Sequence, residues 1–407
     1  MPGPYRGCDR GLADLVGEGR PGDLDTVQTF DAHPFDPPPG VEALRRELHE
    51  FIAREVPVSD AAGRANSWAV CDAGFSRAMG RAGYIGMIWP TEYGGQGKHP
   101  LHRYVVLEEL LVAGAPVGMH WIADRQTGPL LLRYGTEEQR RKWLPSIAAG
   151  ETYACIGMSE PGAGSDLAAI RTTGVREGEG WRINGQKVWT TNAHNAHLMI
   201  ALVRTEEGSQ RNEGLTQFLI PMDTPGVVVR PVLDLVGGHD FNEVFLDNVL
   251  VPDDARVGPE GNGWKQVTAE LSLERSGPER YLSSYAALTE LIRFAGPDPE
   301  PVLAGLIGRL TAELWTLRQM SRSTAAKLAA GEDPALEAAI VKDLGNSFEQ
   351  ETPRAIQAAL DGSGDLSAGD DLARVLALLL QVSPSFSLRG GTREILRGII
   401  ARGLGLR

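Results

Sequence analysis

The hydrophobic periodicity of this 407-residue chain changes twice, and that change constrains the fold more than any single motif does. From Val41 onward, apolar residues such as Leu44 and Leu48 recur at spacings of three and four, which is typical of one buried helix face. Another helix is expected over residues 101–114, and Thr136 begins a third because Thr-Glu-Glu-Gln forms a capping box. The chain up to about residue 150 is therefore predicted to be all-helical.

The pattern then changes to that of strands. Residues 181–191 (WRINGQKVWTT) hold the pair Asn184-Gly185 between β-prone segments, which predicts a hairpin turn at that pair. Further strands are expected in segments rich in Val, Leu, Ile and Phe, namely 215–222, 227–232 and 243–251. No segment long enough for a helix separates these strands. The sheet is therefore predicted to be antiparallel, a sandwich or barrel rather than a set of βαβ units.

A helical pattern returns after residue 258. Leucines repeat at spacings of three and four over 303–317, and a last helical region is expected from about residue 372. The predicted fold class is an α+β multidomain protein. It has an N-terminal all-helical domain, a middle antiparallel β domain and a C-terminal domain like a four-helix bundle. The expected boundaries are an extended arm over 1–40 and domains over 41–152, 153–258 and 259–407.

The charge and cysteine content exclude some classes of function. The chain has 40 basic and 53 acidic side chains, a net charge of −13 and no basic block, so a nucleic-acid-binding face is not expected. Cys8, Cys71 and Cys155 are too widely spaced for a disulfide framework or a zinc site. No signal-peptide pattern opens the chain, and no apolar run approaches the ~20 residues of a membrane span. A cytoplasmic protein without a membrane anchor is expected.

The segment 156–166 (IGMSEPGAGSD) combines turn residues with hydroxyl groups. It is either a loop in which Pro and Gly set the turns, or a backbone that approaches a flat ligand, with Ser159 and Ser165 aimed at it. It matches neither a Walker loop nor a Rossmann glycine motif, so neither site is expected. His194 and His197 follow along the chain, but without a third ligand they are interpreted as polar loop residues, and no metal site is expected.

Two segments together resemble the acyl-CoA dehydrogenase family. Residues 156–166 are similar to its SEP-x-GSD signature, and KVWTTN at 187–192 is similar to its K-x-W-[IT]-[ST]-N segment. The resemblance covers most of the chain beyond residue 40, and includes 83–97, 134–145, 242–252 and 390–407. The fold of that family has the same helical–β–helical order that the periodicity predicts.

This resemblance implies an FAD whose isoalloxazine ring lies between the β domain and the C-terminal helices. Carried over by position, the residues implied to bind FAD are Ile156, Met158, Ser159, Gly162, Gly164, Trp189, Thr190 and Thr191, with Thr392 and Glu394 in the tail. Ser159 would contact the flavin through its hydroxyl, Trp189 would pack against the ring system, and Thr191 would hydrogen-bond near N5. Such a set is chemically reasonable because a ring system needs an apolar wall and a few fixed donors.

The implied reaction is dehydrogenation at the α and β carbons of an acyl-CoA, which needs a base and donors to the thioester oxygen. Many family members place the base where this chain has Gly390. A subgroup places it on the first helix of the C-terminal domain, where this chain has Glu274, so Glu274 is the candidate base. Arg275, Ser165 and the N–H of Gly390 are the implied substrate contacts. The alternative is that Glu274 and Arg275 are solvated helix charges.

The resemblance also implies an electron-transferring flavoprotein as electron acceptor and a role in fatty acid metabolism. Two family segments that reach the FAD of a neighbouring subunit are poorly matched here, at 292–302 and 356–365. This departure resembles members of α2β2 assemblies, so a heterotetramer with a sister chain stands beside a homodimer or homotetramer. A flavin oxidase or monooxygenase, and a non-catalytic subunit, stay open as alternative functions. The acyl pocket is expected around His120–Gln126 and Tyr281–Tyr285.

Overall fold

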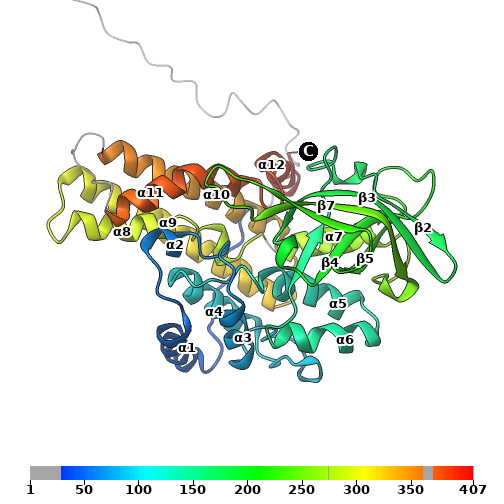
Figure 1. Cartoon of the computed structure of the whole chain (residues 1–407). Helices are drawn as coiled ribbons and strands as arrows, with labels where there is room; N and C mark the ends of the chain where they lie inside the picture. The colour runs from blue at the N-terminus through cyan, green and yellow to red at the C-terminus, as the bar shows by residue number, and fades with distance from the viewer. Residues whose placement is uncertain (1–28, 274, 361–369, 407) are drawn as a thin grey trace, which may run out of the picture.

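The first part of the structure is all-helical, as predicted. Figure 1 shows the computed structural model of the chain, which describes residues 29–273, 275–360 and 370–406. The capping box is confirmed: Thr136 Oγ1 accepts the backbone N–H of Gln139 at 3.2 Å, and Gln139 Oε1 accepts that of Thr136 at 3.0 Å. The helices of this part are α1 (Val41–Glu55), α2 (Ala61–Ala65), α3 (Ala73–Arg81), α4 (Pro100–Val112), α5 (Gly128–Tyr134) and α6 (Glu137–Ala148).

The middle of the chain forms one twisted sheet. Its strands are β1 (Ala154–Gly157), β2 (Thr173–Glu177), β3 (Gly180–Thr191), β4 (Leu198–Arg204), β5 (Leu215–Pro221), β6 (Val227–Val232) and β7 (Phe241–Pro252). The order is β1-β4-β2-β3-β7-β6, and β5 pairs with β4. Most pairs are antiparallel, as predicted, but β2 meets β4 in parallel at one residue pair, Thr173 with Arg204, and β1 runs parallel to β4 over its whole length. That parallel pair is possible because the β2–β3 hairpin lies between β1 and β4 in sequence and supplies the long connection that parallel strands need.

The predicted hairpin turn at Asn184-Gly185 is wrong. β3 continues through this pair and follows β7 over most of its length, with a register shift between Ile183 and Gly185. The chain instead reverses between Glu177 and Gly180, where β2 meets β3 and Gly178 has a φ of 59°. Glycine is needed at position 185 because a Cβ there would lie 2.3 Å from Thr172 Oγ1. The Asn-Gly pair therefore marks a close approach inside a strand, not a turn.

The last part of the chain is again helical and packs beside the first (Figure 1). The predicted long helix is confirmed as α9, and its buried leucines 303, 310 and 317 recur every seven residues along one face. α9 packs against α10, which contacts α12 in turn. The helices are α7 (Gly263–Leu273), α8 (Tyr285–Ala295), α9 (Pro301–Ala329), α10 (Ala335–Leu360), α11 (Asp371–Val382) and α12 (Arg393–Gly403).

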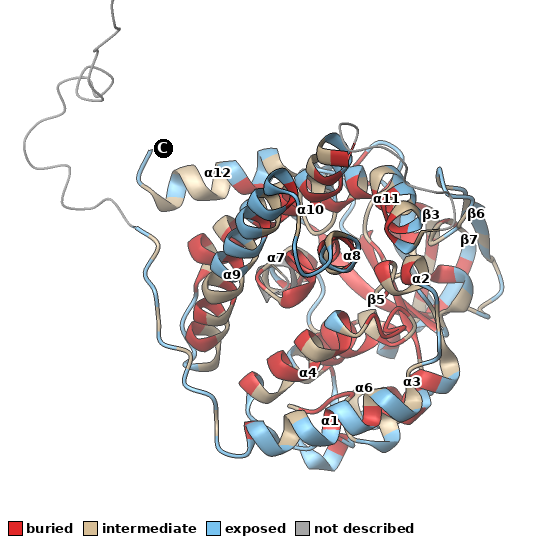
Figure 2. Ribbon diagram, turned by 90° about the vertical axis from the view of Figure 1, so that its left-hand side faces the viewer, coloured by how far each residue is buried: buried red, intermediate tan, exposed pale blue. Residues whose placement is uncertain are grey.

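The two helical parts share one hydrophobic core, to which Ile200 of β4 and Leu219 of β5 also belong, and the sheet has a second core of its own. Leu110 of α4, Leu291 of α8 and Leu376 of α11 lie in the same buried cluster. Figure 2 shows the corresponding buried faces of α4, α7 and α8, which point inward. A smaller cluster joins the sheet to the helices, because Leu202 of β4 and Val267 of α7 pack in it together. The predicted order of helical, β and helical domains is confirmed.

The described end of the predicted N-terminal arm is extended and lies along α9. The His33 N–H donates to Ser323 Oγ at 2.6 Å, and Lys327 Nζ lies 2.8 Å from Asp31 Oδ2. Residues 1–28 lie outside the described part of the chain. Among the helices that the structure describes, none is both long enough and apolar enough to cross a membrane.

Candidate functional site

The loop that follows β1 carries the first group of predicted flavin residues. Ile156, Met158 and Ser159 are half-buried, so each keeps part of its surface open to a ligand. Met158 also packs on the cluster that contains Val267 and Trp264 of α7. The loop therefore lies where the sheet meets the first helix of the C-terminal domain.

A buried ion pair holds this loop against β3. Lys187 is fully buried, and its Nζ lies 2.9 Å from Glu160 Oε1 while donating to the carbonyls of Met158 at 3.2 Å and Leu202 at 2.6 Å. Glu160 also accepts the backbone N–H of Arg171 at 2.6 Å and of Thr172 at 2.9 Å. Burial lowers the pKa of Lys187 to about 8, while the Glu160 carboxylate opposes that shift.

Sequence reasoning missed the role of this ion pair. Its signal was present, because Glu160 and Lys187 both stand inside the segments that carry the family resemblance. A charged residue inside a buried strand is rare unless it is paired. Lys187 in β3 therefore implied a partner nearby.

Trp189 stands at a bulge in β3. The register between β3 and β7 shifts between Lys187 and Thr190, and Trp189 has a φ of 58°. A positive φ is costly for a bulky residue, and such strain is concentrated at functional sites. The bulge leaves the indole 58% exposed, in edge contact with Phe241 at a centroid distance of 6.0 Å. An exposed, strained tryptophan beside the half-buried 156–159 loop fits the face of a flavin ring.

The neighbours of Trp189 differ in exposure. Thr191 is half-buried, whereas the Thr190 side chain is fully buried in the sheet. A contact of Thr190 with a ligand would therefore involve its backbone.

In the loop after β1, Gly164 and Ser165 are exposed. A Cβ at Gly164 would meet no atom within 4 Å, so no close protein contact explains this glycine. Gly162 has the same open surroundings.

The tail forms a tight turn before α12. Gly390 and Gly391 have φ values of 62° and 101°, which only glycine adopts readily. Buried Lys342 of α10 holds the turn, because its Nζ donates to the carbonyls of Arg389 and, at 2.7 Å, Gly391. The two predicted FAD contacts of the tail then begin α12. Thr392 is the N-cap, and Glu394 is exposed in the first turn.

The candidate base falls outside the described residues. Glu274 follows directly after the end of α7 at Leu273. Arg275, the predicted neighbouring charge, is half-buried.

A buried charge pair, Glu349 with Arg389, lies directly beside the turn at Gly390. Glu349 of α10 accepts the N–H of Ser283 at 2.8 Å and lies 3.4 Å from the guanidinium of Arg389. Burial raises the pKa of Glu349, with Arg389 opposing, and burial lowers the pKa of Arg389 to about 10. Arg389 also lies over the ring of Trp68 at 4.2 Å. The residue before Gly390 is thus fixed on several sides.

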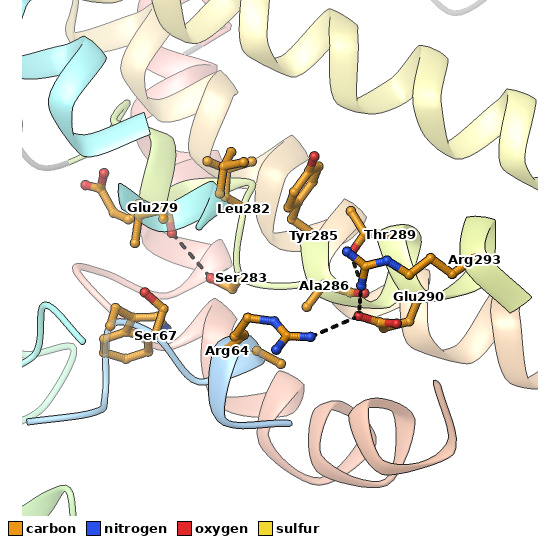
Figure 3. Close-up of a pocket in the computed structure, with 14 residues that line it drawn as sticks. Arg64, Ser67, Glu279, Leu282, Ser283, Tyr285, Ala286, Thr289, Glu290 and Arg293 are labelled. Carbon is orange, nitrogen blue, oxygen red and sulfur yellow. Dashed lines mark hydrogen bonds and ion pairs between the residues drawn. The ribbon is translucent and has the colours of Figure 1, made fainter. Parts of the chain in front are cut away.

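A cavity of about 220 Å³ lies between α2, the end of α4 and α8. Figure 3 shows it with Glu279 near one end and Glu290 with Arg293 near the other. The predicted acyl-pocket segment 281–285 contributes Leu282, Ser283 and Tyr285 to its wall. The other predicted segment, 120–126, contains a π-helical turn over Ala123–Thr127, and its Arg125 forms an ion pair with Glu279. Segment 120–126 therefore contacts Glu279, which stands two residues before segment 281–285.

Three domains of one known protein family together match nearly the whole described chain. The N-terminal domain of acyl-CoA dehydrogenases matches residues 39–151, the middle domain matches 155–249 and the C-terminal domain matches 261–405.

Individual relatives give the same result. The chain is 36% identical over 341 residues to acyl-CoA dehydrogenase IpdE1 of Mycobacterium tuberculosis, covering 82% of this chain and 87% of that protein. Among solved structures, the Tcur3481-Tcur3483 steroid ACAD is 27% identical with a TM-score of 0.82, covering 92% of this chain and 99% of that one. The ChsE4-ChsE5 complex of M. tuberculosis is 30% identical with a TM-score of 0.78, covering 92% of this chain and 100% of that one.

Proposed function

The chain belongs to the acyl-CoA dehydrogenase family, and from that premise we propose that it converts an acyl-CoA thioester to the 2,3-enoyl-CoA and passes the electrons to an electron-transferring flavoprotein. The family is FAD-dependent, and this chain is an enzyme of that family. The observation that carries the proposal is the strained, exposed Trp189 beside the half-buried loop of Ile156, Met158 and Ser159.

FAD supplies a two-electron acceptor for the hydride that leaves the β carbon. Trp189 and the loop after β1 would hold the flavin ring, with Ser159 and Thr191 as polar contacts. Thr392 and Glu394 would contact the cofactor from the tail. This assignment is supported by the partial exposure of Ser159 and Thr191 and by the open surroundings of Gly162 and Gly164.

The proton chemistry is assigned to the C-terminal domain. Glu274 removes the α proton, the Gly390 N–H donates to the thioester oxygen as negative charge develops there, and Ser165 and Arg275 contact the substrate. The rigid turn around Gly390, held by Lys342, supports the donor role because a preorganised N–H costs little reorganisation. No carboxylate stands at position 390, so the base must come from another element.

The acyl group that we propose is bulky and largely apolar. Support comes from the interruption between α7 and α8, after which Leu282, Ser283, Tyr285 and Ala286 line a cavity. The name of a structural relative, a steroid ACAD, points to the same class.

We also propose a sister chain as partner. Two of the structural relatives are two-component proteins by their names, and the segments 292–302 and 356–365 match the family poorly.

The test of the base is Glu274→Gln, measured as the rate of anaerobic flavin reduction by an acyl-CoA. We expect bound flavin at the wild-type level and a reduction rate lower by about 10²–10⁴-fold, the usual contribution of a general base. Glu260→Gln serves as control, because Glu260 is a partly exposed residue that pairs with Arg176. Reduction of the Glu274→Gln flavin at the wild-type rate would remove Glu274 from the mechanism.

A further inference from the structure

One face of α10 contacts both of the segments to which the proton chemistry is assigned. Lys342, Gly345 and Glu349 are spaced by three and four residues, so they lie on the same face of this helix. Lys342 holds the turn at Gly390 through two main-chain carbonyls. Gly345 and Glu349 contact the segment 276–284, which follows the proposed base along the chain.

The segment 276–284 lies close against this face. A Cβ at Gly345 would lie 2.1 Å from the carbonyl oxygen of Arg280, so only glycine allows this approach. One turn further along α10, Glu349 Oε1 accepts the backbone N–H of Ser283 at 2.8 Å. A shift of the segment along α10 would therefore break this hydrogen bond.

The end of the segment nearest to the proposed base is fixed as well. Ser321 of α9 donates its hydroxyl to the carbonyl of Ser276, which stands two residues after Glu274. Ser321 in turn accepts the hydroxyl of Tyr104 at 2.9 Å, and both serines are buried. The segment is thus bonded to α9 at one end and to α10 at the other, which makes it a firm support for the residues that precede it.

The second oxygen of Glu349 faces the turn at Gly390. Oε2 lies 3.4 Å from the guanidinium of Arg389, the residue directly before Gly390, and Arg389 also donates to Ser283 Oγ at 3.2 Å. Glu349 is fully buried, and an ionised carboxylate accepts through both of its oxygens. One carboxylate therefore bonds to the segment after the base and to the residue before the thioester donor.

Stability alone does not account for a buried ion pair of this kind. Replacing such a pair by apolar residues is often neutral or stabilising, because both charges must be taken out of water. The removal of a proton, in contrast, depends strongly on geometry. A misplacement of about 1 Å, caused by a change far from the reacting atoms, can slow a reaction by about 10²-fold.

On the premise of the proposed function, we propose that Glu349 is a positioning residue that sets the distance between the base Glu274 and the Gly390 N–H. It does so by bonding to Ser283 on one side and to Arg389 on the other. The proposed contacts with FAD and with the thioester are assigned to other residues. Loss of this link should therefore slow the removal of the α proton without weakening the binding of either molecule.

The experiment measures exchange of α protons with D2O for 3,3-dimethylbutanoyl-CoA bound to the purified holoenzyme. This thioester has α protons but no hydrogen on its β carbon, so it can exchange protons but cannot reduce the flavin. We expect exchange in Glu349→Gln to be about 10–10²-fold slower than in wild type, because the amide NH2 group would face Arg389 and displace it. The FAD content, and the affinity for the thioester measured by calorimetry, should stay at their wild-type values.

Glu337→Gln is the matched control. Glu337 is a buried glutamate of the same helix, 7% exposed, and it pairs with Lys327 of α9 at 2.7 Å. Loss of its charge should lower the midpoint of thermal unfolding, as in Glu349→Gln, but should leave the exchange rate unchanged. Exchange at the wild-type rate in Glu349→Gln contradicts the proposal, and so does an equal loss of exchange in the control.

Two further variants complete the test. If Glu349→Gln does not fold, Arg389→Lys breaks the same link from its other side, since lysine lacks the planar guanidinium. Exchange at the wild-type rate in Arg389→Lys would then overturn the proposal. Glu274→Gln separates this inference from the proposed function. Exchange that requires Glu274 but not Glu349 removes this inference alone, whereas equal exchange in wild type and Glu274→Gln removes the proposed base and this inference with it.

Discussion

Among single residues, His120 is a buried imidazole that makes the stability of the fold depend on pH. It is 5% exposed and lies 2.8 Å from Ser76 Oγ through Nδ1. Burial lowers its pKa to about 4, with the charge of Asp124 opposing. The unfolded chain binds a proton on this residue near pH ~6.5, whereas the folded protein does so only near pH 4.

The sign of the effect follows from this difference. Between those two pH values the unfolded state holds more protons, so stability is lost as the pH falls, by about 3 kcal/mol over the whole window. The free energy of unfolding should therefore fall less steeply on acidification in His120→Gln than in wild type. Urea denaturation at several pH values between 4 and 6.5 measures this. Identical slopes in the two proteins would contradict the burial argument.

The sequence identifies some residues of the site but not others, for a physical reason. Ser159, Trp189 and Thr191 stand in contiguous motifs, so their resemblance is visible along the chain. Arg125 and Glu279 are far apart in sequence and meet only because the π-helical turn faces the segment after α7. Such a pair has no local pattern, and the charge of each residue alone favours a solvated position.

Among elements, β3 shows what a local sequence pattern can predict about a strand and what it cannot. The β-prone residues of this segment predict the strand correctly, but the Asn184-Gly185 pair predicts a turn that the structure does not have. A hairpin signal holds only if the flanking segments pair with each other, and here both pair with β7. The real turn at Gly178 lies a few residues earlier, in a charged stretch without a strong turn dipeptide.

β3 and the loop after β1 should act as one unit through Lys187. Lys187→Met removes the cation but leaves Glu160 buried, which costs about 3–5 kcal/mol by analogy with broken buried ion pairs. We expect a lower midpoint of thermal unfolding. We also expect weaker binding of FAD, because the carbonyl of Met158 loses the hydrogen bond from Lys187 Nζ. Flavin content after gel filtration and thermal denaturation measure the two effects.

Two further variants make that prediction specific. Adding Glu160→Gln to Lys187→Met should recover part of the stability, since no unpaired charge is then buried. Lys142→Met is the control, because Lys142 is exposed on α6. If Lys187→Met retains FAD as firmly as this control does, the ion pair does not position the loop.

At the scale of the whole molecule, periodicity alone predicted the order of the domains. That order is encoded along the chain, since each element carries its own spacing of apolar residues. The shared core of the two helical parts, and the cavity between α2 and α8, arise from long-range packing. Neither follows from local spacing, which explains why the acyl pocket could be expected near residues 120–126 and 281–285 only through the family resemblance.

Anaerobic titration of the purified protein with an acyl-CoA, followed by its visible absorbance, tests the central claim most directly. We predict a yellow protein whose flavin absorbance bleaches on addition of the thioester, and returns when an electron-transferring flavoprotein is added but only slowly in air. Rapid reoxidation in air with release of peroxide would identify an oxidase instead. A colourless protein, or a flavin that stays oxidised with every acyl-CoA tried, would contradict the account.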